Sequence, residues 1–218
     1  MSGTRLVIFD VDGTLVDSQN IIVEAQRRTF AAHGLPAPDR RASLSVVGLS
    51  LQEAFAALVG VAGPAASMAA HYKGLFHDLR ADPSLVEPLF PGAAESVARL
   101  SSRADTMLGI ATGKSRRGVR HLFERMDWAR AFATVQTADD HPSKPAPDMI
   151  LAALEETGVA PRDASMIGDT TFDMAMAKAA GVRAIGVSWG YHSVDALRAA
   201  GAAGIIEDFA ELEGLLET

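Results

Sequence analysis

Two aspartates stand two residues apart at the end of an apolar run near the start of the chain. The run RLVIF at 5–9 is followed by DVDGT at 10–14. In an extended chain alternate side chains point to the same side, so Asp10 and Asp12 would face one site. Such a pair suits one ionised nucleophile or metal ligand and one carboxyl that handles a proton. Gly13 would allow a tight turn whose N–H groups face an anion, although two solvated aspartates in a turn are the alternative for this segment alone.

A second polar segment, TGKS at 112–115, follows the apolar run TMLGIA at 106–111. The Thr112 hydroxyl and the backbone N–H groups around Gly113 would meet an anion at a helix start, where the helix dipole is positive. The segment is not a Walker A loop, because the required upstream glycine is missing. A plain strand-to-helix turn would also account for it.

Two more segments carry charged residues that could join the same site. Lys144 precedes Pro145, which favours an extended backbone at the mouth of a helical pattern. Asp169 and Asp173 lie in GDTTFD at 168–173, after the apolar run ASMI at 164–167. Taken singly, a lysine is usually solvated and aspartates at a helix start often serve as caps.

All four segments follow predicted strands, which is where ligands bind in open parallel sheets. Together they offer carboxylates for a hard divalent cation, a hydroxyl, an ammonium and several N–H donors. This equipment is typical of phosphoryl transfer.

The elements that must position these residues alternate along the chain. Short apolar runs predict buried strands, and periodic apolar residues between them predict helices, so we expect a parallel sheet with right-handed crossovers. Glycines at 158, 181 and 201 predict helix ends, and prolines at 91 and 147 predict first-turn positions. The predicted strands are 5–9, 106–111, 164–167 and 184–187, and the predicted helices are 91–103, 115–126, 147–157, 171–180 and 194–200.

Residues 16–89 interrupt this alternation, because they contain several helical patterns and no convincing buried strand. The clearest pattern places apolar residues from Met68 to Leu79 on one helical face, which must pack against another apolar surface. We therefore expect an inserted helical domain at 16–89 and a second domain made of 1–15 and 90–218.

The composition limits the remaining possibilities. The chain has 218 residues, 48% hydrophobic and 22% charged, with a formal net charge of -7 and no cysteine. We expect no membrane span and no secretory signal, a cytoplasmic location, a monomer or homodimer, and no nucleic-acid partner, since basic residues do not cluster. Any metal must take oxygen or nitrogen ligands.

The four segments resemble the ordered motifs of the haloacid dehalogenase superfamily: DVDGT at 10–14, TGK at 112–114, Lys144-Pro145 and GDTTFD at 168–173. The resemblance spans nearly the whole chain. It implies an α/β fold, a Rossmann-like parallel sheet core with an inserted small α-helical cap domain at 16–89.

The resemblance also implies catalytic roles. Asp10 would attack phosphorus to give an aspartyl-phosphate, and Asp12 would protonate the leaving oxygen and then activate water. Thr112 and Lys144 would hold the phosphoryl oxygens, with Lys144 also restraining Asp10. The implied substrate-binding residues are Gly13, Thr112, Gly113 and Lys144.

The implied cofactor is Mg²⁺. Asp10, the backbone carbonyl of Asp12, and Asp169 would bind it, and Asp173 would support the metal site directly or through water and Lys144.

The substrate implied by the resemblance is a small-molecule phosphate ester. Dehalogenases of this superfamily lack the second aspartate of the first motif, so Asp12 favours phosphate esters. The segments 187–193 and 46–50 resemble those of phosphoglycolate phosphatase-like members, and specificity would reside around 48–52. A phosphosugar mutase or sugar phosphatase, a pyrophosphatase and a nucleotidase remain alternatives. A catalytically silent binding module is a more remote one, because intact buried charges are costly to keep without a function.

Overall fold

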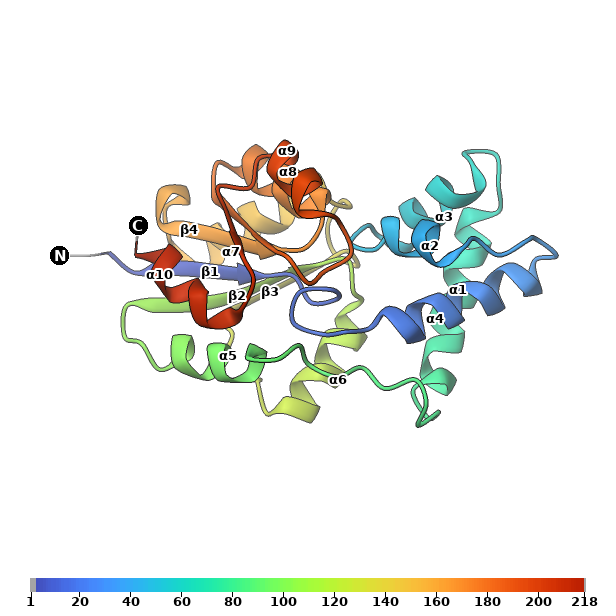
Figure 1. Cartoon of the computed structure of the whole chain (residues 1–218), viewed down its shortest axis with the longest axis horizontal. Helices are drawn as coiled ribbons and strands as arrows, with labels where there is room; N and C mark the ends of the chain where they lie inside the picture. Colours follow the sequence, from blue (N-terminus) through green and yellow to red (C-terminus); the bar gives the residue numbers. More distant parts are fainter. Residues whose placement is uncertain (1–2, 218) are drawn as a thin grey trace.

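The computed structural model describes residues 3–217, which form a six-stranded sheet flanked by helices (Figure 1). The strand order is β3-β2-β1-β4-β5-β6, and every neighbouring pair is parallel. The predicted parallel sheet is confirmed, and the chain reverses its direction of winding between β1 and β4, where ligands bind in such sheets. The strands are β1 Arg5–Phe9, β2 Thr106–Thr112, β3 Thr134–Thr137, β4 Ala164–Gly168, β5 Arg183–Val187 and β6 Gly204–Ile206.

Helices cover both faces of the sheet because alternate strand residues point to opposite sides. Val7 and Phe9 of β1 pack in one apolar core with α5 and α6, whereas Leu6 and Ile8 pack in another with α7 and α8. Within residues 3–217 no helix has the length and apolar character needed to cross a membrane. The flanking helices are α5 Ala93–Ser101, α6 Arg116–Met126, α7 Asp148–Thr157, α8 Thr171–Ala180, α9 Val194–Ala200 and α10 Leu212–Leu216, with 3-10 turns at Pro161–Asp163 and Phe209–Glu211.

The predicted helix ends are confirmed, and the predicted starts are shifted. Gly158, Gly181 and Gly201 follow α7, α8 and α9 with φ of 68°, 71° and 107°, a backbone conformation that glycine adopts without a Cβ penalty. The first-turn placement of the prolines was wrong by one or two residues. Pro147 is the N-cap of α7, and Pro91 lies two residues before α5 begins.

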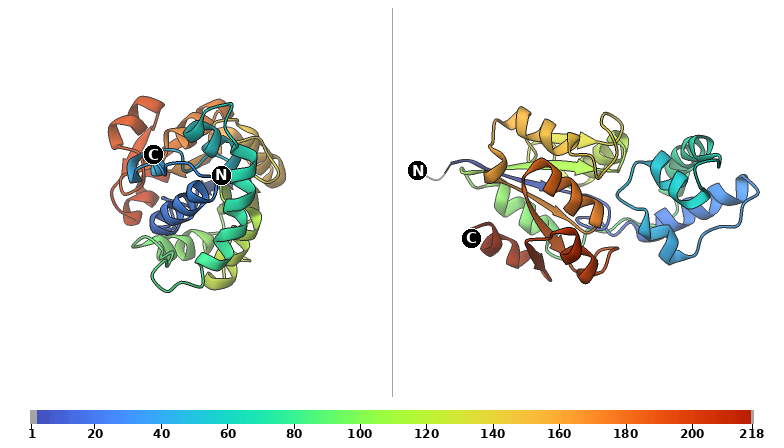
Figure 2. Two further views of the ribbon diagram at one scale, coloured as in Figure 1. Left: turned by 90° about the vertical axis from the view of Figure 1, so that its right-hand side faces the viewer. Right: turned by 90° about the horizontal axis from the view of Figure 1, so that it is seen from above.

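Residues between β1 and α5 form four helices that gather beyond the carboxyl ends of the strands (Figures 1 and 2). They share an apolar core of their own, in which Phe55 contacts Phe30 and Tyr72. The two connections to this bundle lie side by side: Val16 bridges Leu89, and the backbone N–H of Asp17 donates to the carbonyl of Pro88 over 2.8 Å. These helices are α1 Gln19–Ala32, α2 Arg40–Ser45, α3 Leu51–Val59 and α4 Ala65–Leu79.

Candidate active site

Asp10 stands at the end of β1, in the middle of the sheet. Its backbone N–H donates to the carbonyl of Ile167 on β4 over 2.9 Å, and its Oδ1 accepts from the backbone N–H of Val11 over 2.7 Å. The side chain is fully buried, and this burial raises the pKa of Asp10 to about 6, with Lys144 lowering it and Asp173 raising it further.

Lys144 joins two of the predicted carboxylates. Its Nζ lies 3.0 Å from Asp10 Oδ2 and 2.6 Å from Asp173 Oδ1, and none of the lysine side chain is exposed. Burial alone would lower the pKa of Lys144, but Asp10 and Asp173 raise it to about 12. The lysine is therefore charged and held at the carboxyl edge of the sheet, rather than solvated on the surface.

Asp173 is tied into the start of α8. Its Oδ2 accepts from the Thr170 backbone N–H over 3.0 Å and from the Thr170 hydroxyl over 2.6 Å, and Thr170 caps the backbone N–H of Asp173 in return. Both oxygens of Asp173 are thus engaged, one by this capping box and one by Lys144. Thr170, which the sequence analysis did not single out, is the cap of this helix.

Asp169 follows β4 and faces the turn after β1. The Thr14 hydroxyl donates to its Oδ1 over 3.0 Å, and the backbone N–H of Tyr191 donates to its Oδ2 over 2.9 Å. Gly13 has a φ of 89°, and a Cβ there would collide with the Asp169 carboxylate. Glycine at position 13 therefore allows this turn to lie close to the Asp169 carboxylate.

The donor set of this cluster fits a hard divalent cation. Oxygens of Asp10, Asp169 and Asp173 lie within 4.8 Å of one another, and Asp10 Oδ2 forms an ion pair with Lys144 Nζ over 3.0 Å. Burial and the neighbouring carboxylates Asp173 and Asp10 raise the pKa of Asp169 well above its usual range. A cation among these oxygens would relieve the repulsion between the carboxylates.

Asp12 is separated from this cluster and lies on a cavity of about 270 Å³. Its Oδ1 accepts from the ammonium of Lys114 over 2.6 Å, and Lys114 also donates to Glu87 Oε1 over 2.9 Å. The two aspartates of DVDGT therefore have different environments: Asp10 is held by Lys144, and Asp12 by Lys114.

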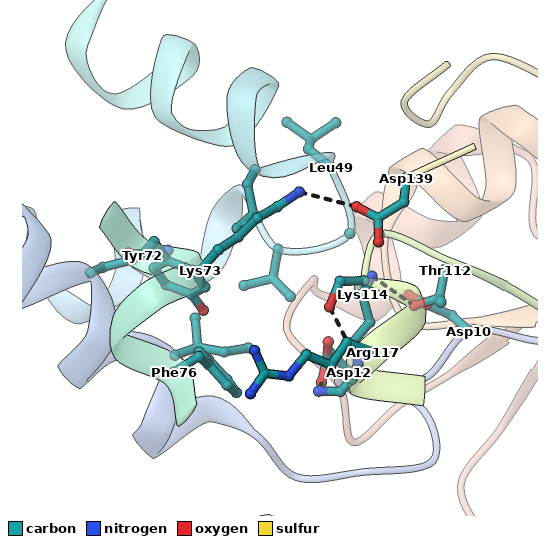
Figure 3. Close-up of a pocket in the computed structure, with 18 of the residues that line it drawn as sticks. Asp10, Asp12, Leu49, Tyr72, Lys73, Phe76, Thr112, Lys114, Arg117 and Asp139 are labelled. Atoms are coloured by element: carbon teal, nitrogen blue, oxygen red, sulfur yellow. Dashed lines mark hydrogen bonds and ion pairs between the residues drawn. The ribbon is translucent and has the colours of Figure 1, made fainter. Parts of the chain in front are cut away.

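The cavity lies between the carboxyl ends of the strands and the helical bundle (Figure 3). Asp10 and Thr112 form part of its wall on the sheet side, and Tyr72 and Phe76 of α4 form part of the opposite wall. Lys73 of α4 contacts Asp139 across the cavity, with 3.0 Å between Nζ and Oδ1. The predicted residue Gly113 also lines the cavity, and a Cβ there would come within 2.6 Å of the carbonyl oxygen of Gly48.

The structure thus brings Asp10, Lys144, Asp169 and Asp173 together, and places Asp12, Thr112 and Gly113 on the adjoining cavity. Gly13 lies against Asp169 and is not part of the cavity wall. Lys114 and Glu87 were not predicted as site residues. Lys114 was part of the TGK segment, but no pattern in the sequence links it to a glutamate 27 residues earlier.

Comparisons with known proteins point to one enzyme family. Residues 7–187 match the haloacid dehalogenase-like hydrolase family. The chain is 38% identical to a protein of Dickeya dadantii named "Probable phosphatase IndB", over 96% of this chain and 92% of that one. It is 35% identical to the phosphoglycolate phosphatase of Rhodospirillum rubrum, over 95% of this chain and 89% of that one.

A solved structure supports the same assignment at the level of the fold. A haloacid dehalogenase-like family hydrolase from Streptococcus pneumoniae superposes with a TM-score of 0.84 at 26% identity, over 99% of both chains. The chain belongs to the haloacid dehalogenase-like hydrolases.

Proposed function

We propose that this protein is a Mg²⁺-dependent phosphatase that hydrolyses a small phosphate monoester through an aspartyl-phosphate on Asp10. The observation that carries the proposal is the buried group of Asp10, Lys144, Asp169 and Asp173, with Asp12 held separately on the adjoining cavity. Asp10 and Asp12 both line the cavity but are held by different ammonium groups, Lys144 and Lys114, and two carboxylates in different surroundings suit a nucleophile and an acid/base.

The residues of this chain divide the reaction into two displacements. A carboxylate oxygen of Asp10 forms a bond to phosphorus as the bond to the leaving oxygen breaks, and Asp12 gives that oxygen a proton. Asp12 then takes a proton from water as the water oxygen attacks phosphorus, which releases inorganic phosphate and regenerates Asp10. Lys144 and Thr112 hold the phosphoryl oxygens through both steps.

Mg²⁺ would be held by Asp10, Asp169 and the backbone carbonyl of Asp12, where it would neutralise negative charge on carboxylates and phosphoryl oxygens. Asp173 supports this site through Lys144, since both of its oxygens are already engaged.

Residues 16–89 would act as a cap over residues 1–15 and 90–218. Two features support this division: the paired connections around Val16 and Leu89, and the position of the cavity between α4 and the sheet edge. A cap of this kind excludes water and contacts the leaving group, while the sheet edge holds the phosphoryl group.

The leaving group would be small and anionic, as in phosphoglycolate. Arg117 of α6 lines the cavity and has no ion-pair or hydrogen-bond partner among residues 3–217, so it is available to a carboxylate of the substrate. The relative from Rhodospirillum rubrum named as a phosphoglycolate phosphatase supports the same substrate class.

The proposal is tested with a panel of phosphoglycolate, sugar phosphates, nucleotides and pyrophosphate, ranked by kcat/KM with Mg²⁺ present. Phosphoglycolate or a similarly small anionic ester should rank first. A preference for pyrophosphate or nucleotides would overturn the substrate class, and no hydrolysis of any phosphate would overturn the phosphatase assignment.

A further inference from the structure

The orientation of Asp12 depends on one neighbouring side chain. Among residues 3–217, the Asp12 carboxylate has a single hydrogen-bond or ion-pair partner, the Lys114 ammonium at 2.6 Å. Asp12 and Lys114 both line the cavity. Because a proton donor works only within hydrogen-bond reach of its acceptor, whatever fixes Lys114 also determines where Asp12 can act.

Lys114 is itself confined. Its side chain is 7% exposed, and its Nζ lies 2.9 Å from Glu87 Oε1 and 5.7 Å from the centre of the Phe76 ring. Its aliphatic stem passes Gly118 of α6, where a Cβ would come within 2.9 Å of the stem. The glycine in the first turn of α6 thus leaves room for the lysine to reach across the cavity wall.

Glu87 is anchored from two directions. The Arg80 guanidinium, just after α4, donates to Glu87 Oε2 over 2.8 Å, and Arg125 of α6 donates to the Glu87 backbone carbonyl over 2.6 Å. Glu87 also lies next to Pro88, within the paired connections of the helical bundle. Acidic and basic side chains therefore alternate in a row of contacts from the cavity to the end of α4, in the order Asp12, Lys114, Glu87 and Arg80.

Glu87 and Lys114 are both charged at neutral pH. Burial would raise the pKa of Glu87, but Lys114 and Arg80 bring it to about 2. Burial would lower the pKa of Lys114, but Asp12 and Glu87 raise it. The contact between Lys114 and Glu87 is thus an ion pair between mostly buried groups, and removing one partner leaves the other with a single counter-charge, Asp12 for Lys114 or Arg80 for Glu87.

We propose that Glu87 is a positioning residue for the reaction: it fixes the Lys114 ammonium, and Lys114 in turn fixes the Asp12 carboxylate. This inference rests on the proposed function, because it assigns Asp12 the transfer of a proton to the leaving group.

The test compares two substrates that differ mainly in their need for that proton. Phenyl phosphate releases a basic phenolate that needs protonation, whereas 4-nitrophenyl phosphate releases a less basic anion of similar shape. kcat/KM reports the steps up to departure of the leaving group, so the ratio of the two values measures proton donation by Asp12. A purely structural role of Glu87 would lower both values alike.

Glu87→Gln should lower kcat/KM for phenyl phosphate about tenfold more than for 4-nitrophenyl phosphate, a modest part of what general acid catalysis contributes. Lys114→Met should change the ratio at least as much, and Glu87→Gln should add no further change in the Lys114→Met background. Glu24→Gln removes a carboxylate that pairs with Arg27 and Arg28 on α1, away from the cavity, and serves as the matched control with an unchanged ratio.

The proposal would be overturned if folded Glu87→Gln lost the same factor in kcat/KM for both substrates. It would also be overturned if the double variant changed the ratio by the product of the two single changes. Thermal unfolding checks the fold of each variant. If Glu87→Gln does not fold, Lys114→Met, which leaves Glu87 paired with Arg80, decides alone whether the ratio depends on this link. Asp10→Asn distinguishes a failure of the proposed function from a failure of this inference. Residual turnover by Asp10→Asn would contradict the proposed function. If Asp10→Asn is inactive but the ratio of the two kcat/KM values is unchanged in the Glu87 and Lys114 variants, only this inference is contradicted.

Discussion

At the scale of single residues, the site separates carboxylates by their surroundings. Asp10 is buried beside Lys144, which forms an ion pair with its Oδ2. Asp12, two residues later, lies on the cavity and contacts Lys114. Like charges at this spacing are tolerable only when each has its own counter-charge, and different partners allow different roles.

Lys144→Ala should lower kcat/KM for every phosphate ester by the same factor, because in the proposed mechanism the lysine would hold the phosphoryl oxygens that all substrates share. It should also lower the free energy of unfolding by about 3–5 kcal/mol, since Asp10 and Asp173 would lose a buried counter-charge. Urea unfolding without divalent cations and a substrate panel measure the two effects. A changed order of substrates would contradict the assigned role.

At the scale of elements, the positions of the site residues follow from the sheet. Each predicted segment comes after a strand or at the start of a helix, and parallel strands bring their carboxyl ends to one edge. The local structure around these segments positions the other site residues: α8 is capped by Thr170 and Asp173, Arg117 lies in the first turn of α6, and Lys114 immediately precedes the α6 N-cap Ser115.

Thr170→Val should lower the free energy of unfolding by about 1 kcal/mol, the usual effect of losing an N-cap, and should also lower kcat. The activity falls because the Thr170 hydroxyl holds Asp173, which holds Lys144. Asp39→Ala is the matched control, because Asp39 caps α2, an exposed helix start away from the cavity. If Thr170→Val and Asp39→Ala lose the same stability and also retain the same activity, Thr170 has only a capping role.

Arg117→Ala should lower kcat/KM for phosphoglycolate about tenfold or more relative to 4-nitrophenyl phosphate, whose leaving group carries no carboxylate. A hydrogen bond between charged groups contributes about 1.5–3 kcal/mol, which corresponds to at least such a factor. Arg120→Ala, on the same helix but outside the cavity wall, is the control. Equal losses on both substrates would mean that Arg117 does not recognise the leaving group.

The sequence predicted the elements with continuous apolar runs and missed those without them. β1, β2, β4 and β5 are buried on both faces and read as apolar segments, whereas the edge strand β3 (TVQT) is mostly polar and β6 has three residues. Asp10 and Asp169 directly follow β1 and β4, so the apolar runs predicted their position at the carboxyl ends of the strands, whereas Lys144 lies in the connection between β3 and α7. The contact between Lys114 and Glu87 depends on how the returning connection packs, and no periodicity encodes that.

At the scale of the whole molecule, a helical bundle and a sheet edge enclose one cavity (Figure 3). The two parts also contact each other through Lys73 and Asp139, and through the Ser50 backbone N–H, which donates to the Ser143 hydroxyl over 2.7 Å. The formal net charge of -7 and the closely spaced carboxylates both favour a cation, rather than an anion, among Asp10, Asp169 and Asp173.

Chelation by EDTA should abolish hydrolysis of every ester, and Mg²⁺ should restore it. Ca²⁺ should inhibit, because it prefers a larger and looser shell of oxygen ligands. Mg²⁺ at about 100 times its Kd should also stabilise the fold by about 2.7 kcal/mol, which a thermal melt detects without substrate. Full activity in excess chelator would contradict the metal assignment.

Transfer of the phosphoryl group to Asp10 is tested most directly by trapping it there. Asp12→Asn should retain the nucleophile but lack the base that activates water, so it should release a stoichiometric burst of nitrophenolate from 4-nitrophenyl phosphate and then stall. Acid quenching and mass spectrometry should find the phosphate on the peptide that contains Asp10, and Asp10→Asn should give no burst and lose about 10³-fold or more in kcat. Phosphate on another residue, or turnover by Asp10→Asn within about tenfold of the unmodified protein, would contradict the account.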